Sequence, residues 1–207
     1  MSTCGHVSSR YTEKSRGSLR KESGAQLVEF AVALPLLVVF VVGIFDFSGA
    51  FTLKQKLTNV ARDAARTAAT GPSNDLSSAT PVSVRSAFQV VDNYFASNQL
   101  NTCNIAGPPT ASGLTWTYSG TTGVGCPPTG LKIIINRGYY FPASAAATIA
   151  NANCTAQSAG SQTAVVSTCV SVQYGYAWRF GKVASLLGPS TVLPDTITAT
   201  AVAMNED

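Results

Sequence analysis

Charged residues are scarce in this chain, and their scarcity excludes several functions. Only 12% of the 207 residues are charged, against about a quarter in ordinary soluble domains. Five of the 14 basic residues precede Gly24, which leaves nine basic and eight acidic residues in a nearly neutral body. A basic surface for nucleic acid is therefore not expected.

Motifs for catalysis and for metal binding are also missing. The one histidine, His6, precedes Gly24, and none of the five cysteines forms a C-x-x-C pair. The glycines between Gly120 and Gly125 are followed by two prolines, not by the helix that a nucleotide-binding loop needs. The acids Asp46, Asp63, Asp75, Asp92 and Asp195 are scattered, with no short-range pair among them. We therefore expect no catalytic residue, no metal, no cofactor and no enzyme.

What the sequence does contain is a long apolar run, SGAQLVEFAVALPLLVVFVVGIFDF, from Ser23 to Phe47. Ala25 to Phe45 is 21 residues with one charge, Glu29. At about 1.5 Å per residue this run crosses the ~30 Å hydrocarbon core of a membrane. Two alternatives are a buried helix of a soluble protein and a secretory signal peptide. A soluble helix of this length normally has a polar face, which this run lacks. A signal peptide requires a shorter run with a small-residue cleavage site after it.

The residues after the run continue with helical periodicity. One apolar stripe recurs at spacings of three and four residues: Leu53, Leu57, Val60, Ala61, Ala64, Ala65 and Ala68. Thr70-Gly71-Pro72 then predicts the helix end, with glycine as a left-handed cap. We expect one helix from about Ala25 to Thr70, with an amphipathic second half packed on the chain's own globular part.

Glu29 lies inside the apolar boundary without a cation in the run. An acid at the centre of a span costs about 2.5–3.5 kcal/mol, and less near its edge, so such a group usually has a partner. Cleavage between Gly24 and Ala25 would create an α-ammonium group one helical turn from the Glu29 carboxylate. That amine belongs either to the same chain or to a neighbouring subunit. In the second case Glu29 sets the register of assembly.

These residues resemble a known family. A short basic leader ends in Gly24, the apolar helix follows at once, and Glu29 and Phe30 occupy the fifth and sixth positions after it. This pattern is similar to the site cut by prepilin peptidases. GAQLVEFAVALPLLVVFVVGIFDFSGAFTLKQKLTNVARDAARTAA more narrowly resembles the TadE-like family, and the closing segments VSVQYGYAW and LPDTITATAVAMNED resemble it more weakly.

The resemblance implies a function and a set of partners. TadE-like proteins are minor pseudopilins of the tight-adherence (Tad, or Flp) pilus system, and the family's major pilins are much shorter than this chain. The resemblance therefore implies a minor structural subunit that contacts the membrane, prepilin peptidase, other pilin subunits and the Tad assembly platform, and that supports adherence. A permanently membrane-anchored extracytoplasmic binding domain that never polymerises is the alternative.

Cysteine usage indicates the compartment better than charge, because basic residues flank the run on both sides. Removal of the leader removes Cys4 and leaves Cys103, Cys126, Cys154 and Cys169. Four cysteines allow three pairings; we favour Cys103–Cys126 and Cys154–Cys169 because each closes a local loop, with free buried thiols as the alternative. Disulfides would place the domain outside the cytoplasm.

The remainder predicts an α+β domain. Thr80-Pro81 indicates the start of a helix with Val84, Phe88, Val91 and Phe95 on one face, ending near Leu100. Strands are expected at 114–118, 131–136, 164–180 with a bend at Gly175, and 196–204; period-2 alternation marks the third of them. Residues 143–162 are expected to form a surface loop. Aromatic side chains are candidates either for the core or for a subunit contact: Trp116, Tyr118, Tyr139, Tyr140 and Phe141.

The expected fold class is thus α+β, a pilin-like lollipop with a long N-terminal helix and a small antiparallel sheet. Four parts follow: a cleaved cytoplasmic leader (1–24), a transmembrane segment (25–47), an amphipathic helix extension (48–70) and an extracytoplasmic domain (71–207). The expected location is a single pass through the inner membrane with the C-terminal domain outside. Incorporation in an extracellular pilus is left open.

Overall fold

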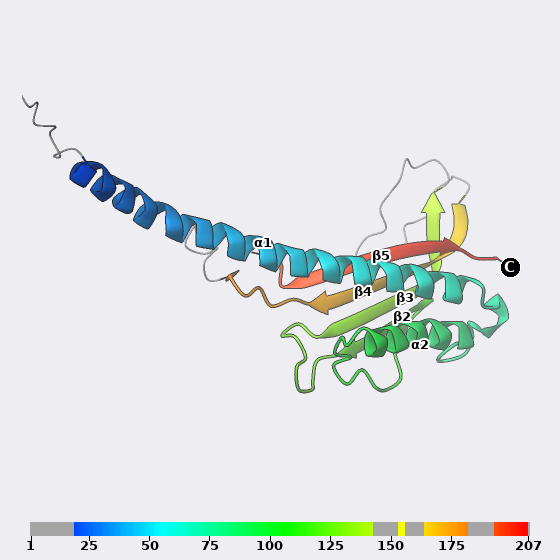
Figure 1. The fold of residues 1–207 in the computed structure, drawn as a ribbon. Helices are drawn as coiled ribbons and strands as arrows, with labels where there is room; N and C mark the ends of the chain where they lie inside the picture. Colours follow the sequence, from blue (N-terminus) through cyan, green and yellow to red (C-terminus); the bar gives the residue numbers. More distant parts are fainter. Residues whose placement is uncertain (1–18, 143–152, 156–163, 182–192, 207) are drawn as a thin grey trace, which may run out of the picture. The chain divides into compact units, whose positions relative to one another are not determined.

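A computed structural model describes residues 19–142, 153–155, 164–181 and 193–206 (Figure 1). Most of the expected leader and of the expected loop at 143–162 lies outside the described residues, as does the linker at 182–192. The elements are α1 (Leu19–Ala69), the 3-10 turn η1 (Ser73–Asp75), α2 (Val82–Ser97), β1 (Thr110–Ser112), β2 (Thr115–Gly120), β3 (Leu131–Pro142), β4 (Ala164–Gly175) and β5 (Thr196–Met204). The α+β fold with a long N-terminal helix and a small antiparallel sheet is confirmed.

Two compact units make up the chain, Met1–Ile44 and Phe45–Asp207, and α1 contributes to both. The sheet belongs to the second unit, and its five strands follow one another in the order β1-β2-β3-β4-β5, each antiparallel to the next. Such a meander needs only short connections, and its pairings are local in sequence.

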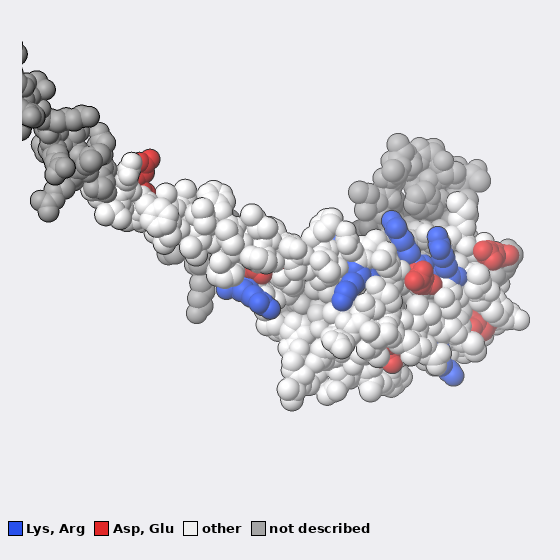
Figure 2. Space-filling model, in the orientation of Figure 1, with Lys and Arg blue, Asp and Glu red and all other residues white. Residues whose placement is uncertain are grey.

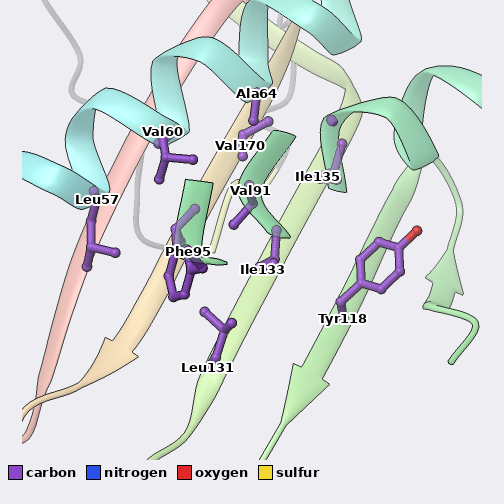
Figure 3. Close-up of a cluster of buried hydrophobic side chains, with 14 of the residues drawn as sticks. Leu57, Val60, Ala64, Val91, Phe95, Tyr118, Leu131, Ile133, Ile135 and Val170 are labelled. Carbon is purple, nitrogen blue, oxygen red and sulfur yellow. The ribbon is translucent and has the colours of Figure 1, made fainter. Parts of the chain in front are cut away.

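The core of the second unit lies between the sheet and two helices. Figure 3 shows α1 contributing Leu57 and Val60, α2 contributing Phe95, and β3 contributing Leu131 and Ile133. These five side chains are 0–2% exposed. Burial of each contributes about 1.5–3 kcal/mol, so the helices and the sheet stabilise one another. The apolar stripe predicted from the sequence is confirmed, because every member from Leu53 to Ala68 is buried.

Both ends of α1 differ from the prediction in detail. The helix begins at Leu19 and not at Ala25, because the intervening Leu-Arg-Lys-Glu residues are good helix formers. It ends at Ala69, where the stop was predicted. Gly71, however, does not adopt a positive φ, so the left-handed cap was wrong. Its missing side chain serves packing: a Cβ there would lie 2.4 Å from the Ser83 Cβ.

The start of α2 is capped by a residue outside the predicted motif. Pro81 occupies the N-cap itself and Thr80 supplies no cap. Instead the Asp75 Oδ2 accepts a hydrogen bond from the Ser83 backbone N–H at 3.1 Å. This carboxylate satisfies one of the otherwise unpaired amides of the first turn and favours the positive end of the helix dipole.

Strand predictions hold for some strands and fail for others. β5 occupies Thr196–Met204 as predicted, whereas β1 was missed because its three residues carry no apolar pattern. β3 extends beyond Asn136 to Pro142, and its pairing with β4 shifts between Asn136 and Tyr139. The alternation predicted along β4 does not appear as one buried face, because every residue from Ser167 to Val172 is buried, whereas Val166 is 46% exposed. β4 itself ends at Gly175, short of the predicted Phe180.

Most of the aromatic side chains proposed as contacts belong to the core. Trp116 is 1% exposed, and its Nε1 donates to the Ala79 carbonyl at 3.1 Å. Tyr118 stacks on Phe88 with ring centroids 4.2 Å apart, and Tyr139 is 1% exposed. These three rings therefore belong to the core, one of the two alternatives that the sequence left open. Tyr140 is 38% exposed, while nothing of the Phe141 side chain is described.

Two disulfides close local loops, Cys103–Cys126 across 23 residues and Cys154–Cys169 across 15. These are the pairings that the sequence favoured. Cys103 and Cys126 join the loop after α2 to the loop after β2, while Cys154 attaches the short described segment at 153–155 to β4. Each bridge contributes about 3 kcal/mol by the chain-entropy argument.

A buried arginine binds the C-terminal end of α1, and no feature of the sequence predicts it. Arg137, on β3, is 0% exposed. Its guanidinium donates to the carbonyls of Ala68 and Gly71, the latter at 2.7 Å, and lies 3.4 Å from the Thr168 hydroxyl. A cation is favoured at a helix C-terminus, where carbonyls lack partners in the helix. Arg137 thus ties the last turn of α1 to the sheet.

Candidate functional site

The surface of α1 between Phe30 and Ile44 is apolar in every direction. Apart from the half-buried Val42, its large apolar side chains are between 42% exposed at Val41 and 72% exposed at Val32. Six consecutive residues, Leu36 to Val41, are among them, and successive helical residues point about 100° apart. Figure 2 shows the corresponding long stretch of helix without charged side chains. A helix that is apolar all round requires an apolar surrounding, which this chain does not supply among its described residues.

One described helix is long and apolar enough to cross a membrane, from Gly24 to Ala69, and none of its most apolar 18-residue stretch is buried. Pro35 lies inside this helix and has no N–H to donate to the carbonyl of Ala31. Membrane helices tolerate such a proline. The chain therefore has one N-terminal candidate span followed by a small domain.

Gly24, Ala25, Glu29 and Phe30 lie on consecutive turns of α1 and are all exposed, Phe30 by 64%. Ala25 and Glu29, four residues apart, share one face of the helix. Within the described part of the chain the Glu29 carboxylate has no ion-pair partner, and the predicted site residues near it are its neighbours along α1, Ala25 and Phe30.

Gly24 has no structural reason to be glycine. It lies inside α1, and a Cβ placed on it would meet nothing within 4 Å. Glycine inside a helix is about 0.5–1 kcal/mol less stable than alanine. The chain's own packing therefore does not account for this residue.

A buried carboxylate, Asp46, directly follows the apolar run, although in the sequence it is one of several scattered acids. Asp46 is 5% exposed. Its Oδ2 accepts from the Phe180 N–H at 3.2 Å, and its backbone carbonyl and Oδ1 accept from the Tyr176 hydroxyl at 3.0 and 3.3 Å. These bonds attach the segment after β4 to α1. An acid directly after the run and tyrosine near the end of a strand were the only signals in the sequence.

Aromatic rings surround this attachment. The Trp178 ring meets Phe47 and Tyr176 edge to face, with centroids 5.3 and 4.9 Å apart, and its Nε1 donates to the Pro194 carbonyl at 2.7 Å. Burial, followed by the negative charge of Asp46, raises the pKa of the Tyr176 hydroxyl above its usual 10.0, so it remains a donor. Tryptophan and tyrosine are enriched at the boundary between lipid and water. We call Phe47, Tyr176 and Trp178 the aromatic collar.

The described residues contain no group of three or more histidine, cysteine or acidic side chains that could hold a metal. All four cysteines of the second unit are in disulfides, so none of them offers a thiolate ligand. The chemistry of the site is therefore that of an apolar surface, one acid and an aromatic boundary.

Comparison with known families gives a match within this helix. Residues 24–66 match the family model described as TadE-like protein. The TadE-like segment begins at Gly24 and contains Glu29, the whole apolar run, Asp46 and most of the buried stripe. It stops before the sheet, so the weaker resemblance of the closing strands stays a prediction. No curated protein and no solved structure matches the chain.

The TadE-like segment associates the chain with the Tad pilus system and with a structural class of protein, and nothing in the match indicates catalysis. Its position coincides with the exposed apolar helix, so family and geometry point to the same part of the molecule.

Proposed function

We propose that this protein is a minor pseudopilin-like subunit of a Tad (Flp) pilus, cut by prepilin peptidase between Gly24 and Ala25 and assembled through α1. The observation that carries the proposal is the uncovered apolar surface of α1 inside a TadE-like segment. Before assembly, lipid covers this surface as the helix spans the inner membrane. In the assembled state, the helices of other pilin subunits and of the Tad platform cover it.

Gly24 supports the proposed cleavage. Neither its backbone conformation nor its packing requires glycine, and glycine weakens the helix at this position. A requirement from outside the chain explains its presence, and the active site of a peptidase that accepts only a small residue before the cut supplies one.

Glu29 supports the proposed assembly. Its carboxylate lies within the apolar surface without a partner in the described chain. After cleavage, the α-ammonium of Ala25 lies one turn away on the same face, in the same subunit or in the next one. Pairing between subunits neutralises the acid only at one axial offset, and so fixes the register. Phe30 follows at the next position and packs against the neighbouring helix.

Orientation follows from the second unit. Its two disulfides are stable in an oxidising compartment, so the domain lies outside the cytoplasm while the leader lies inside. From that side the domain supports adherence, whether the subunit joins the filament or stays at its base.

The test compares Glu29→Ala and Glu29→Gln with the matched control Asp63→Asn, which removes an exposed acid from the same helix outside the span. In cells with the complete Tad system, cysteine crosslinking along α1 reports contact between subunits. We expect both Glu29 variants to insert in the membrane normally and to lose most of the crosslinked product, and the control to keep it. Unchanged crosslinking in the Glu29 variants contradicts the register role.

Cleavage is tested separately with a bulky residue, Gly24→Leu, against Gly43→Leu. Both glycines have open surroundings in the structure, so neither change disturbs the fold of the chain. We expect only Gly24→Leu to remain at the uncut mass. A permanently anchored binding domain, the alternative function, predicts an uncut chain in the wild type as well.

A further inference from the structure

A hollow in the second unit opens directly beyond the aromatic collar. It encloses about 490 Å³ and lies between α1 and the segment that follows β4. Ser48, Thr52 and Lys56 line it from α1, at the four-residue spacing of one helix face, and Tyr176 and Arg179 line it from the other side.

The charged groups of the hollow are both positive. Lys56 and Arg179 face it and no acidic side chain lines it. Within the described residues, neither cation is engaged in an ion pair. Asp46, an acid that is hydrogen-bonded to the lining residue Tyr176, is buried and accepts from the Phe180 amide and the Tyr176 hydroxyl, which are neutral donors. The hollow therefore offers two cations to a ligand of negative charge.

Hydroxyl groups complete the polar lining. Tyr174 Oη accepts from the Asn101 N–H at 3.2 Å, so its own hydrogen is available to donate. Ser48 adds an exposed hydroxyl at the edge nearer the apolar run. Two cations with hydroxyl donors suit a phosphate group, whose oxygens accept several charge-assisted hydrogen bonds.

One edge of the hollow lies at the depth of a lipid headgroup. Ser48, Thr52 and Lys56 lie three, seven and eleven residues beyond Phe45 along α1. At about 1.5 Å per residue their backbones lie about 4, 11 and 16 Å beyond the hydrocarbon, and the headgroup layer on each side is about 5–8 Å thick. Ser48 therefore lies at this layer, and the Lys56 side chain, which tilts toward the helix N-terminus, extends back toward it. Tyr176 belongs both to the aromatic collar and to the lining of the hollow, so the hollow begins next to the collar.

We propose that this hollow binds the phosphate of an anionic phospholipid headgroup in the leaflet on the domain side. Lys56 and Arg179 hold the phosphate, the collar packs against the first methylenes of the acyl chains, and the bound lipid fixes how deep the span lies. The proposal rests on the membrane span of the proposed function, but not on cleavage or assembly. A free phosphate ion has the same recognition chemistry, and the test separates the two sources.

The experiment uses the full chain in nanodiscs and in detergent. The probes are phosphatidylglycerol, which is anionic, and phosphatidylcholine, which is not, and native mass spectrometry counts the lipid retained after delipidation. The test variant is Lys56→Gln with Arg179→Gln. The matched control is Arg62→Gln with Arg66→Gln, which removes two exposed charges from α1 outside the hollow. Emission of the buried Trp116 verifies that each variant is folded.

We expect wild type and control to retain phosphatidylglycerol over phosphatidylcholine and the test variant to lose this preference. A basic residue beside an anionic surface is worth roughly fivefold in binding, so loss of both predicts a change of about tenfold to thirtyfold. Equal retention by the test variant, or an equal loss in the control, overturns the proposal. Displacement of the lipid by inorganic phosphate assigns the site to a free ion and also overturns it.

Failure here and failure of the proposed function are distinguishable. An uncut N-terminus with selective lipid retention contradicts the pseudopilin role and leaves the headgroup site intact. A chain that is cleaved and assembles but shows no lipid preference contradicts the headgroup site and leaves the pseudopilin role intact.

Discussion

The buried guanidinium of Arg137 makes a sharp prediction about stability. Arg137→Met keeps a long side chain of similar reach but removes every N–H donor. The Gly71 carbonyl then loses its donor, and the Ala68 carbonyl keeps only the Gly71 N–H at 3.2 Å. The change thus tests whether this cation, and not apolar packing alone, holds the helix end against the sheet.

The magnitude follows from the Gly71 carbonyl, because the Ala68 carbonyl still accepts from the Gly71 N–H. Leaving one buried acceptor unsatisfied costs about 1–3 kcal/mol. The methionine offsets part of this, because a buried cation is expensive to desolvate and an apolar replacement is not. We expect a net loss of about 1–2 kcal/mol, which for a chain of this size lowers Tm by roughly 2–8 °C.

Thermal unfolding of the full chain in detergent, followed by the emission of Trp116, measures the effect. Arg62→Met is the matched control, an exposed arginine of α1 whose loss should change stability by less than about 0.5 kcal/mol. Arg137→Lys, which keeps the charge but cannot span both carbonyls, should fall between wild type and Arg137→Met. A Tm for Arg137→Met equal to that of the control would refute the reasoning.

Three further predictions concern the same unit. Replacing Cys103 and Cys126 together by serine should lower the free energy of unfolding by about 3 kcal/mol, measured by urea titration, and a difference near zero would contradict the loop-closure argument. Gly71→Ala should lower it by about 1–3 kcal/mol because its Cβ meets Ser83, and adding Ser83→Gly should restore stability; no recovery would count against the contact. Burial raises the pKa of Tyr118, Tyr139, Tyr174 and Tyr176 above 10.0. Above this pH the native state holds protons that the unfolded state releases, so the free energy of unfolding should be constant below about pH 10 and fall above it. A tyrosinate absorbance titration checks the pKa shifts, and a pH-independent Tm up to about pH 11 would contradict them.

The parts of the fold with periodic sequence could be predicted from the sequence. The stripe through Leu57 and Val60 specifies one buried face, and the end of α1 was predicted to within one residue. The bounds of β5 were also predicted correctly. The aromatic residues show the limit of this reasoning. Trp116 and Tyr118 carry equal signals for core and for interface, and only the packing of α2 over β2 decides between them.

Features that depend on distant contacts could not be predicted. Arg137 follows the predicted strand 131–136 without any sequence signal of burial, yet it contacts the end of α1, 66 residues from Gly71 in sequence. Asp46 and Tyr176 are 130 residues apart, and neither forms a local motif. Gly71 is a helix stop by composition, but the reason for the glycine is a side chain in the next helix. In each case the partner is set by tertiary packing and not by neighbours along the chain.

The central claim is that the apolar first half of α1 is exposed in the isolated chain because the protein is cut by prepilin peptidase and then assembled through this helix. The most direct test is the intact mass of the protein isolated from cells that carry a prepilin peptidase and the rest of the Tad system. Our account predicts a chain that begins at Ala25, with the leader absent, and the full-length mass when the peptidase is missing. A full-length chain in cells with the active peptidase would contradict it.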